Sequence, residues 1–180
     1  MSITTHSSPP SILIIGVGNA YRSDDAVGLV VVQRLREDMH LQTKQVTIRE
    51  ESGEGTALLE AWKEAEAVIL IDAVRSGVAP GTVHRFDVGR QALPAVFSSA
   101  STHSFGLAEV IEMARALQQL PAHCVVVGIE GKNFAAGMEL SPAVEQAIDS
   151  VVERIRTGVE VLERLTKQIN HIVPANEDIA

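Results

Sequence analysis

The chain has 180 residues, one cysteine, and 15 Lys and Arg against 23 Asp and Glu, which gives a net charge of -8. This balance leaves no broad basic surface for nucleic-acid phosphates or anionic lipids, so we expect neither nucleic acid nor membrane as a partner. The lone Cys124 can form neither an internal disulfide nor a multi-cysteine metal site, and its apolar neighbours predict a buried strand residue in a cytoplasmic protein.

The length fits one domain, because a chain of this size buries roughly 70% of its unfolded surface. The first residues lack the pattern of a signal peptide, and no apolar run approaches the roughly 20 residues that span a bilayer. We expect a flexible N-terminal tail at 1–10, a single domain at 11–168 and a flexible C-terminal tail at 169–180.

Apolar runs alternate with helix-patterned runs along the chain, which is typical of an α/β layer fold. The expected elements are a strand at 11–15, a helix at 25–36, a strand at 45–50, a helix at 56–65, a strand at 67–71, a helix at 106–117, a strand at 123–129 and a helix at 141–165. Ser141 followed by Pro142 predicts the start of the last helix, since it places a capping residue before a first-turn proline.

One segment of the chain predicts a strand of the opposite direction. Residues 78–86, VAPGTVHRF, carry a Pro-Gly turn followed by alternating side chains. Such a segment returns antiparallel, either as a hairpin with the preceding strand or at the edge of the sheet.

The stretch GVGNAYRSDDAVG at 16–28 joins the first strand to the first helix. Gly16 and Gly18 suit a tight turn, and Gly28 suits close packing of the helix on the sheet. A dinucleotide-binding turn is disfavoured because Tyr21 occupies the position of its third glycine and two acids would face the pyrophosphate. The turn is better matched to a cation or a polarised peptide than to phosphate.

Three polar side chains are expected at the carboxyl ends of the strands, where open α/β sheets bind ligands. They are Asp25 after the first strand, Asp72 at the end of the third strand and His103 before a helix. Carboxylate and imidazole groups suit nickel, zinc and related ions, and a pair of carboxylates can also share acid and base work on water.

Each of these residues could also have an ordinary structural role. Asp24 and Asp25 could cap a helix, Asp72 could be a turn residue, and His103 could be a hydrogen-bonded loop histidine. Asn19 is either a turn amide or, together with Gly18, a group that positions substrate backbone.

Taken in order, several segments resemble the NiFe-hydrogenase maturation endopeptidases. They are GVGN, Ser-Asp-Asp at 23–25, Gly28, VILIDA, PGTVHRF, THSFGL and VVVGIEGKNFAAGMELSPAVEQAI. The resemblance covers about residues 12–165, and the order and spacing of the segments make it far more specific than any one motif.

The resemblance implies a three-layer α/β/α sandwich around a five-stranded, mainly parallel sheet with one antiparallel strand. It also implies a protease that removes the C-terminal extension of a hydrogenase large-subunit precursor after nickel insertion. The metal-contacting and catalytic residues would be Asp25, where many relatives have Glu, Asp72 and His103. The nickel would be carried by the precursor and not bound permanently.

Two other functions stay open at this point. A non-proteolytic nickel-checking or metal-delivery protein for hydrogenase assembly could use the same three residues. A dinucleotide-dependent oxidoreductase is a more distant alternative.

Overall fold

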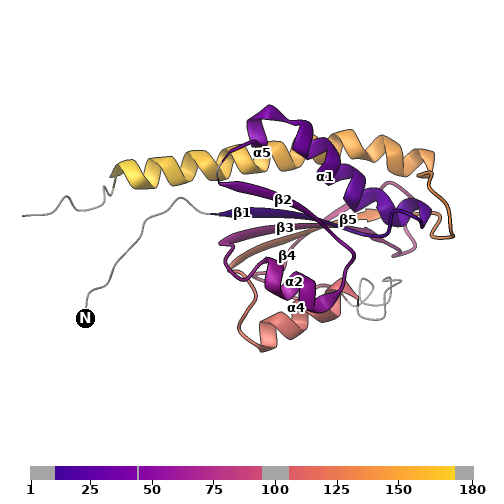
Figure 1. Ribbon diagram of the computed structural model, residues 1–180, viewed down its shortest axis with the longest axis horizontal. Helices are drawn as coiled ribbons and strands as arrows, with labels where there is room; N and C mark the ends of the chain where they lie inside the picture. The colour runs from indigo at the N-terminus through magenta and orange to yellow at the C-terminus, as the bar shows by residue number, and fades with distance from the viewer. Residues whose placement is uncertain (1–10, 44, 95–105, 173–180) are drawn as a thin grey trace, which may run out of the picture.

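The computed structural model describes residues 11–43, 45–94 and 106–172, with side chains described as far as 164. A five-stranded sheet forms the middle of three layers, with α1 (Val27–Glu37) and α5 (Pro142–Ile172) on one face and α2 (Gly55–Ala61) and α4 (Leu107–Ala116) on the other (Figure 1). The three-layer sandwich that we expected is therefore confirmed. The predicted tail at 1–10 lies outside the described residues, as do residues 173–180 of the predicted tail at 169–180, whereas residues 169–172 belong to α5.

The sheet has one antiparallel strand, as expected. Its strands are β1 (Ile12–Val17), β2 (Val46–Glu51), β3 (Ala67–Val74), β4 (Val83–Asp87) and β5 (His123–Glu130). They lie in the order β2-β1-β3-β5-β4, and only β4 runs antiparallel to its neighbour. The apolar strands β1, β3 and β5 take the central positions because helices cover them on both faces.

The segment with the Pro-Gly turn forms an edge strand and not a hairpin. β4 pairs with β5, so β5 separates it from the preceding strand β3. The physical reason is burial: β5 is almost entirely buried and belongs in the centre, whereas β4 is mostly half-buried and suits the edge.

The helices begin close to the predicted positions but differ in length. A short 3-10 helix, η1 (Ser23–Ala26), precedes α1 and takes up the residues that we expected in its first turn. A second one, η2 (Met39–Leu41), follows α1. α2 ends four residues earlier than predicted, and α5 continues to Ile172, past the expected end of the domain at 168.

No helix in the described ranges is both long enough and apolar enough to cross a bilayer.

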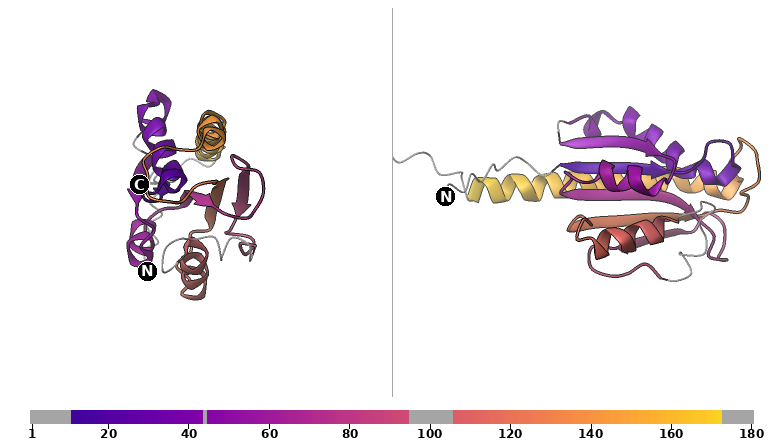
Figure 2. Two further views of the ribbon diagram at one scale, coloured as in Figure 1. Left: turned by 90° about the vertical axis from the view of Figure 1, so that its right-hand side faces the viewer. Right: turned by 60° about the horizontal axis from the view of Figure 1, so that its bottom comes forward.

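Each face of the sheet has its own hydrophobic core. Ile14, Val31 and Ile148 belong to the core under α1 and α5, and Ile15, Val110 and Cys124 belong to the core under α2 and α4. Figure 2 shows the same layers from the carboxyl ends of the strands, with α1 and α5 together on one side. Cys124 is buried in β5, as predicted, and burial, followed by the charge of Asp87, raises the pKa of its thiol to about 12.

Two glycines bring α1 directly against the sheet. A Cβ on Gly28 would overlap the carbonyl oxygens of Val17 and Ile71, and a Cβ on Gly16 would overlap the carbonyl oxygen of Gly28. Gly16 lies within β1 and not in the turn that we expected. The packing role predicted for Gly28 is confirmed, and it fixes the start of α1 beside the ends of β1 and β3.

Gly28→Ala tests this close packing. We expect a loss of about 3 kcal/mol or more in the free energy of unfolding, because backbone atoms cannot move aside for the new methyl group. Gly158→Ala is the matched control, since Gly158 lies in α5 with no atom within 4 Å of an added Cβ. It should stabilise the protein by roughly 0.5–1 kcal/mol. Equal effects of the two substitutions in urea unfolding would contradict the packing argument.

Candidate active site

The chain changes direction across the sheet between β1 and β3. From β1 it passes to β2 on one side, and the next strand, β3, lies on the other side of β1. Open α/β sheets bind ligands at such a switch point, beyond the carboxyl ends of the strands. Both acids that we singled out from the sequence lie at this place, one after β1 and one in β3.

Asp25 and Asp72 form a buried pair of acids. Asp25 lies in η1 with 3% of its surface exposed, and Asp72 is 8% exposed. Asp72 does not end its strand as we expected, because β3 continues for two further residues to Val74. The longer strand holds Asp72 in rigid, extended backbone and not in a turn.

Burial and the negative charge of Asp25 raise the pKa of Asp72 to about 8, although a hydrogen bond from the backbone N–H of Ala73 opposes this shift. The protonated form of Asp72 is therefore favoured at pH 7. Acids with such shifted pKa values are common at catalytic sites, because they can exchange protons near neutral pH.

The third predicted residue, His103, lies outside the described residues. Within the described ranges, no three His, Cys, Asp or Glu side chains are grouped so that they could hold a metal ion. Asp25 and Asp72 are two carboxylates of the kind that nickel accepts.

Asp24 has a structural role that differs from helix capping. Its fully buried carboxylate accepts hydrogen bonds from the backbone N–H groups of Lys132, Asn133 and Ser141, at 2.6–2.7 Å, and from the Ser141 hydroxyl at 2.8 Å. Burial alone would raise the pKa of Asp24, but these hydrogen bonds outweigh it and lower the pKa. The carboxylate thus ties η1 to the loop that leads into α5, whereas the charge of the neighbouring Asp25 acts on Asp72.

The turn after β1 is built around Gly18 and Asn19. Gly18 has φ +154°, and a Cβ there would overlap the carbonyl oxygen of Asp25. The Asn19 side-chain oxygen accepts a hydrogen bond from the N–H of Tyr21 at 2.9 Å, and its carbonyl accepts one from the N–H of Arg22. These bonds favour the turn-amide interpretation of Asn19, and a role in holding substrate stays a prediction.

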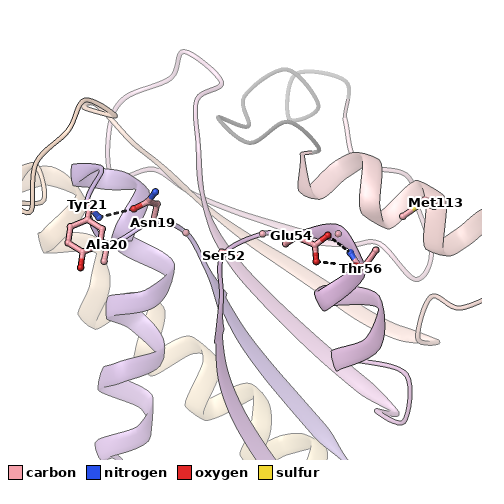
Figure 3. A pocket seen from close by; sticks show the side chains of 10 residues that line it. Asn19, Ala20, Tyr21, Ser52, Glu54, Thr56 and Met113 are labelled. Carbon is pink, nitrogen blue, oxygen red and sulfur yellow. Dashed lines mark hydrogen bonds between the residues drawn. The ribbon is translucent and has the colours of Figure 1, made fainter.

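A cleft of about 870 Å³ adjoins this turn (Figure 3). One wall is the turn Gly18–Tyr21, the other is the segment Ser52–Thr56 after β2, and Met113 of α4 also lines it. Glu54 caps α2 there by accepting hydrogen bonds from the Thr56 hydroxyl and from the N–H groups of Thr56 and Ala57, which lowers its pKa. The sequence analysis did not single out the segment Ser52–Thr56, because its helix cap is Glu54 and Glu is an uncommon residue at that position.

Glu130 is a further buried acid, and sequence reasoning missed it. It ends β5 with 1% of its surface exposed, and its carboxylate accepts hydrogen bonds from the N–H groups of Ser76 and Gly77 and from the Ser76 hydroxyl, at 2.7–3.0 Å. His84 Nε2 lies 3.7 Å from the same carboxylate. The rule that singled out Asp72, a polar side chain at the carboxyl end of a buried strand, could also have found Glu130.

These features define a small α/β protein with a buried pair of acids at the switch point of its sheet. Comparison with known proteins then identifies the family. Residues 29–157 match the family model described as hydrogenase maturation protease. The chain belongs to the hydrogenase maturation protease family and is an endopeptidase of hydrogenase maturation.

Individual relatives agree with the family model. The chain is 30% identical to the hydrogenase 2 maturation protease of Escherichia coli (strain K12), over 85% of this chain and 96% of the relative. It is also 30% identical to the hydrogenase expression/formation protein HupD of Rhodobacter capsulatus, over 88% of this chain and 78% of the relative. The structure of the hydrogenase maturating endopeptidase HybD from E. coli superposes with a TM-score of 0.73 at 28% identity, covering 83% of this chain and 92% of HybD. The endopeptidase is therefore favoured over the metal-delivery and dinucleotide alternatives.

Asp24→Ala tests the tie between η1 and the loop before α5. We expect a loss of about 3–5 kcal/mol in the free energy of unfolding, because three buried N–H groups lose their charged acceptor. This contribution is present above the usual Asp pKa of 3.8 and is lost as the pH falls below it, since the folded-state pKa is lowered. Asp149→Ala, at an aspartate whose side chain is 86% exposed, should change stability by no more than about 0.5 kcal/mol. Similar losses in the two variants would contradict the tie.

Asp72→Asn tests the raised pKa in metal-free protein. Between pH 3.8 and about 8 the folded protein keeps a proton on Asp72 that the unfolded chain releases, so wild-type stability falls as the pH rises through this range. The amide cannot ionise, and we expect the variant to gain about 2 kcal/mol or more relative to wild type between pH 4 and pH 9. Urea unfolding across this range measures the gain. A stability difference that does not change with pH would contradict the raised pKa.

Proposed function

We propose that the protein removes a C-terminal extension from the large-subunit precursor of a NiFe-hydrogenase after nickel insertion, in the cytoplasm. The observation that carries this proposal is the buried pair of acids at the switch point of the sheet, with its raised pKa at Asp72. We assign the activity to a single domain at residues 11–168. Nickel enters as part of the substrate and not as a resident cofactor of this chain.

The nickel of the precursor docks between Asp25, Asp72 and His103. Without a cation, burial and the charge of Asp25 keep a proton on Asp72 at neutral pH. A doubly charged ion beside the pair favours the ionised carboxylates, so docking of a nickel-loaded precursor releases that proton. A nickel-free precursor offers no such charge, and it therefore gains no binding energy from the acids.

Peptide hydrolysis then needs one carboxylate as a base. Water attacks the carbonyl carbon of the scissile bond, a C–O bond forms, and the C–N bond breaks. We assign Asp72 as the base that takes the proton from water and passes it to the departing amine nitrogen. We assign Asp25 as the carboxylate that remains bound to the nickel. The substitution of Asp for the Glu of many relatives shortens the reach of Asp25 by one methylene, so the substrate nickel has to approach η1 more closely.

The substrate chain enters through the cleft beside the turn after β1. Its volume of about 870 Å³ has room for several residues. Gly18 keeps the turn in contact with the backbone of Asp25, and the Asn19 side-chain amide supplies a donor for the substrate backbone or for the negative charge that develops on its carbonyl oxygen.

A cleavage assay with purified protein tests this function. Nickel-loaded and nickel-free large-subunit precursors are incubated with enzyme, and the mass of each product is measured. We expect release of a C-terminal peptide from the nickel-loaded precursor only. Asp72→Asn should lower kcat by about 10²–10⁴-fold, and His103→Ala should do likewise.

The matched control is Asp149→Asn, which changes an exposed aspartate on α5 and should cleave like wild type. Equal cleavage of both precursors would contradict nickel recognition. Full activity of Asp72→Asn would contradict the assignment of the acid pair.

A further inference from the structure

Two arginines meet at one phenylalanine at the carboxyl edge of the sheet. The guanidinium carbon of Arg75 lies 4.5 Å from the centroid of the Phe134 ring. Arg22 donates hydrogen bonds from Nε and Nη2 to the carbonyl oxygen of Phe134, at 3.3 and 3.1 Å. Arg75 directly follows β3, Arg22 lies in the turn after β1, and Phe134 belongs to the loop after β5. The pair therefore lies at the carboxyl edge of the sheet, as the two acids do.

The surroundings hold Arg75 in place before any substrate arrives. Phe134 is buried, with 5% of its surface exposed, so it is a fixed platform for the guanidinium. The residues after Arg75 are fixed as well, because the buried Glu130 accepts hydrogen bonds from the N–H groups of Ser76 and Gly77. Preorganised groups lose little conformational entropy when they bind a ligand.

The guanidinium of Arg75 is exposed and keeps its donors. Among the described residues, none accepts a hydrogen bond from it or forms an ion pair with it, and stacking on an aromatic ring leaves the N–H groups at its rim open. Arg34 and Arg115, in contrast, are each paired with a carboxylate, Asp149 and Glu112. Arg75 therefore differs from these arginines in being oriented but not neutralised.

We propose that Arg75, with the positive charge of Arg22 nearby, binds a carboxylate of the substrate that lies within a few residues of the scissile bond. This inference rests on the proposed function of the acid pair. A planar guanidinium matches a carboxylate in two parallel hydrogen bonds, which a lysine cannot reproduce. The chain as a whole carries a charge of -8, so a negative substrate group is attracted only where cations are concentrated.

The spacing along β3 sets where that carboxylate lies. Arg75 follows Asp72 by three residues, or roughly 10 Å of extended backbone. Asp72 shares its face of β3 with Leu70, which belongs to the core under α2 and α4, whereas Phe134, over which Arg75 lies, belongs to the core under α1 and α5. A substrate segment that crosses the carboxyl edge therefore reaches the acids on one side and the arginines on the other, about three to six residues apart.

Steady-state cleavage of the nickel-loaded precursor tests the inference. Arg75→Met keeps an apolar side chain on Phe134 but removes the charge, and we expect KM to rise about tenfold with kcat nearly unchanged. Arg75→Lys keeps the charge but lacks the planar guanidinium, so its KM should lie between those of wild type and Arg75→Met. Arg34→Met, at an exposed arginine on α1, is the matched control and should leave KM unchanged. An unchanged KM for Arg75→Met would overturn the proposal.

Substrate variants identify the carboxylate. Acidic residues within six positions of the bond are replaced by their amides, in one precursor before the bond and in another after it. The variant that removes the bound carboxylate should raise KM for wild type and leave KM of Arg75→Met unchanged. If both precursors affect wild type and Arg75→Met equally, or if neither affects wild type, the proposal is wrong.

Two further readouts separate substrate binding by Arg75 from a purely structural role. A melting temperature of Arg75→Met well below wild type, with a KM rise that Arg75→Lys does not reverse, would assign Arg75 to loop stability and overturn the binding role. Asp72→Asn lowers kcat, whereas Arg75→Met raises KM and leaves kcat nearly unchanged. The proposed function and this inference therefore succeed or fail in different measurements.

Discussion

The structure depends on one buried charge, the carboxylate of Asp24. Its hydrogen bonds join the short helix after β1 to the loop between β5 and α5, two segments more than 100 residues apart in sequence. Without that anion, three backbone N–H groups would be buried with no acceptor. The positions of Asp25, Arg22 and Phe134 at this edge follow from the tie, since all three belong to the two segments that Asp24 joins.

Two neighbouring aspartates are thus involved in pKa shifts of opposite direction. Asp24 is surrounded by donors, which lower its pKa, whereas Asp25 adds its negative charge to the burial of Asp72 and raises that pKa. The first arrangement stabilises the folded chain. The second costs stability above pH 3.8, and such local costs are common where residues serve function and not stability.

The sequence predicted most of the fold because its elements have strong local patterns. The buried strands β1, β3 and β5 are continuous apolar runs, and Ser141-Pro142 marks the start of α5. The pairing of β4 with β5 could not be predicted, since the choice between neighbours depends on contacts across the sheet. Asp25 and Asp72 followed from strand-end positions. The role of Asp24 did not, because its donors come from residues 132–141, and no local pattern announces a contact over that separation.

The long helix α5 also determines how the molecule can meet a larger protein. It starts at the carboxyl edge of the sheet, runs antiparallel to β1 and ends beyond the amino edge, near the place where β1 begins (Figure 1). Both Ile12 and Ile172 therefore lie away from the acids and the arginines. A surface attachment at the start of β1 or in the last turn of α5 would therefore hold the molecule by the pole opposite the carboxyl edge and leave that edge facing outward.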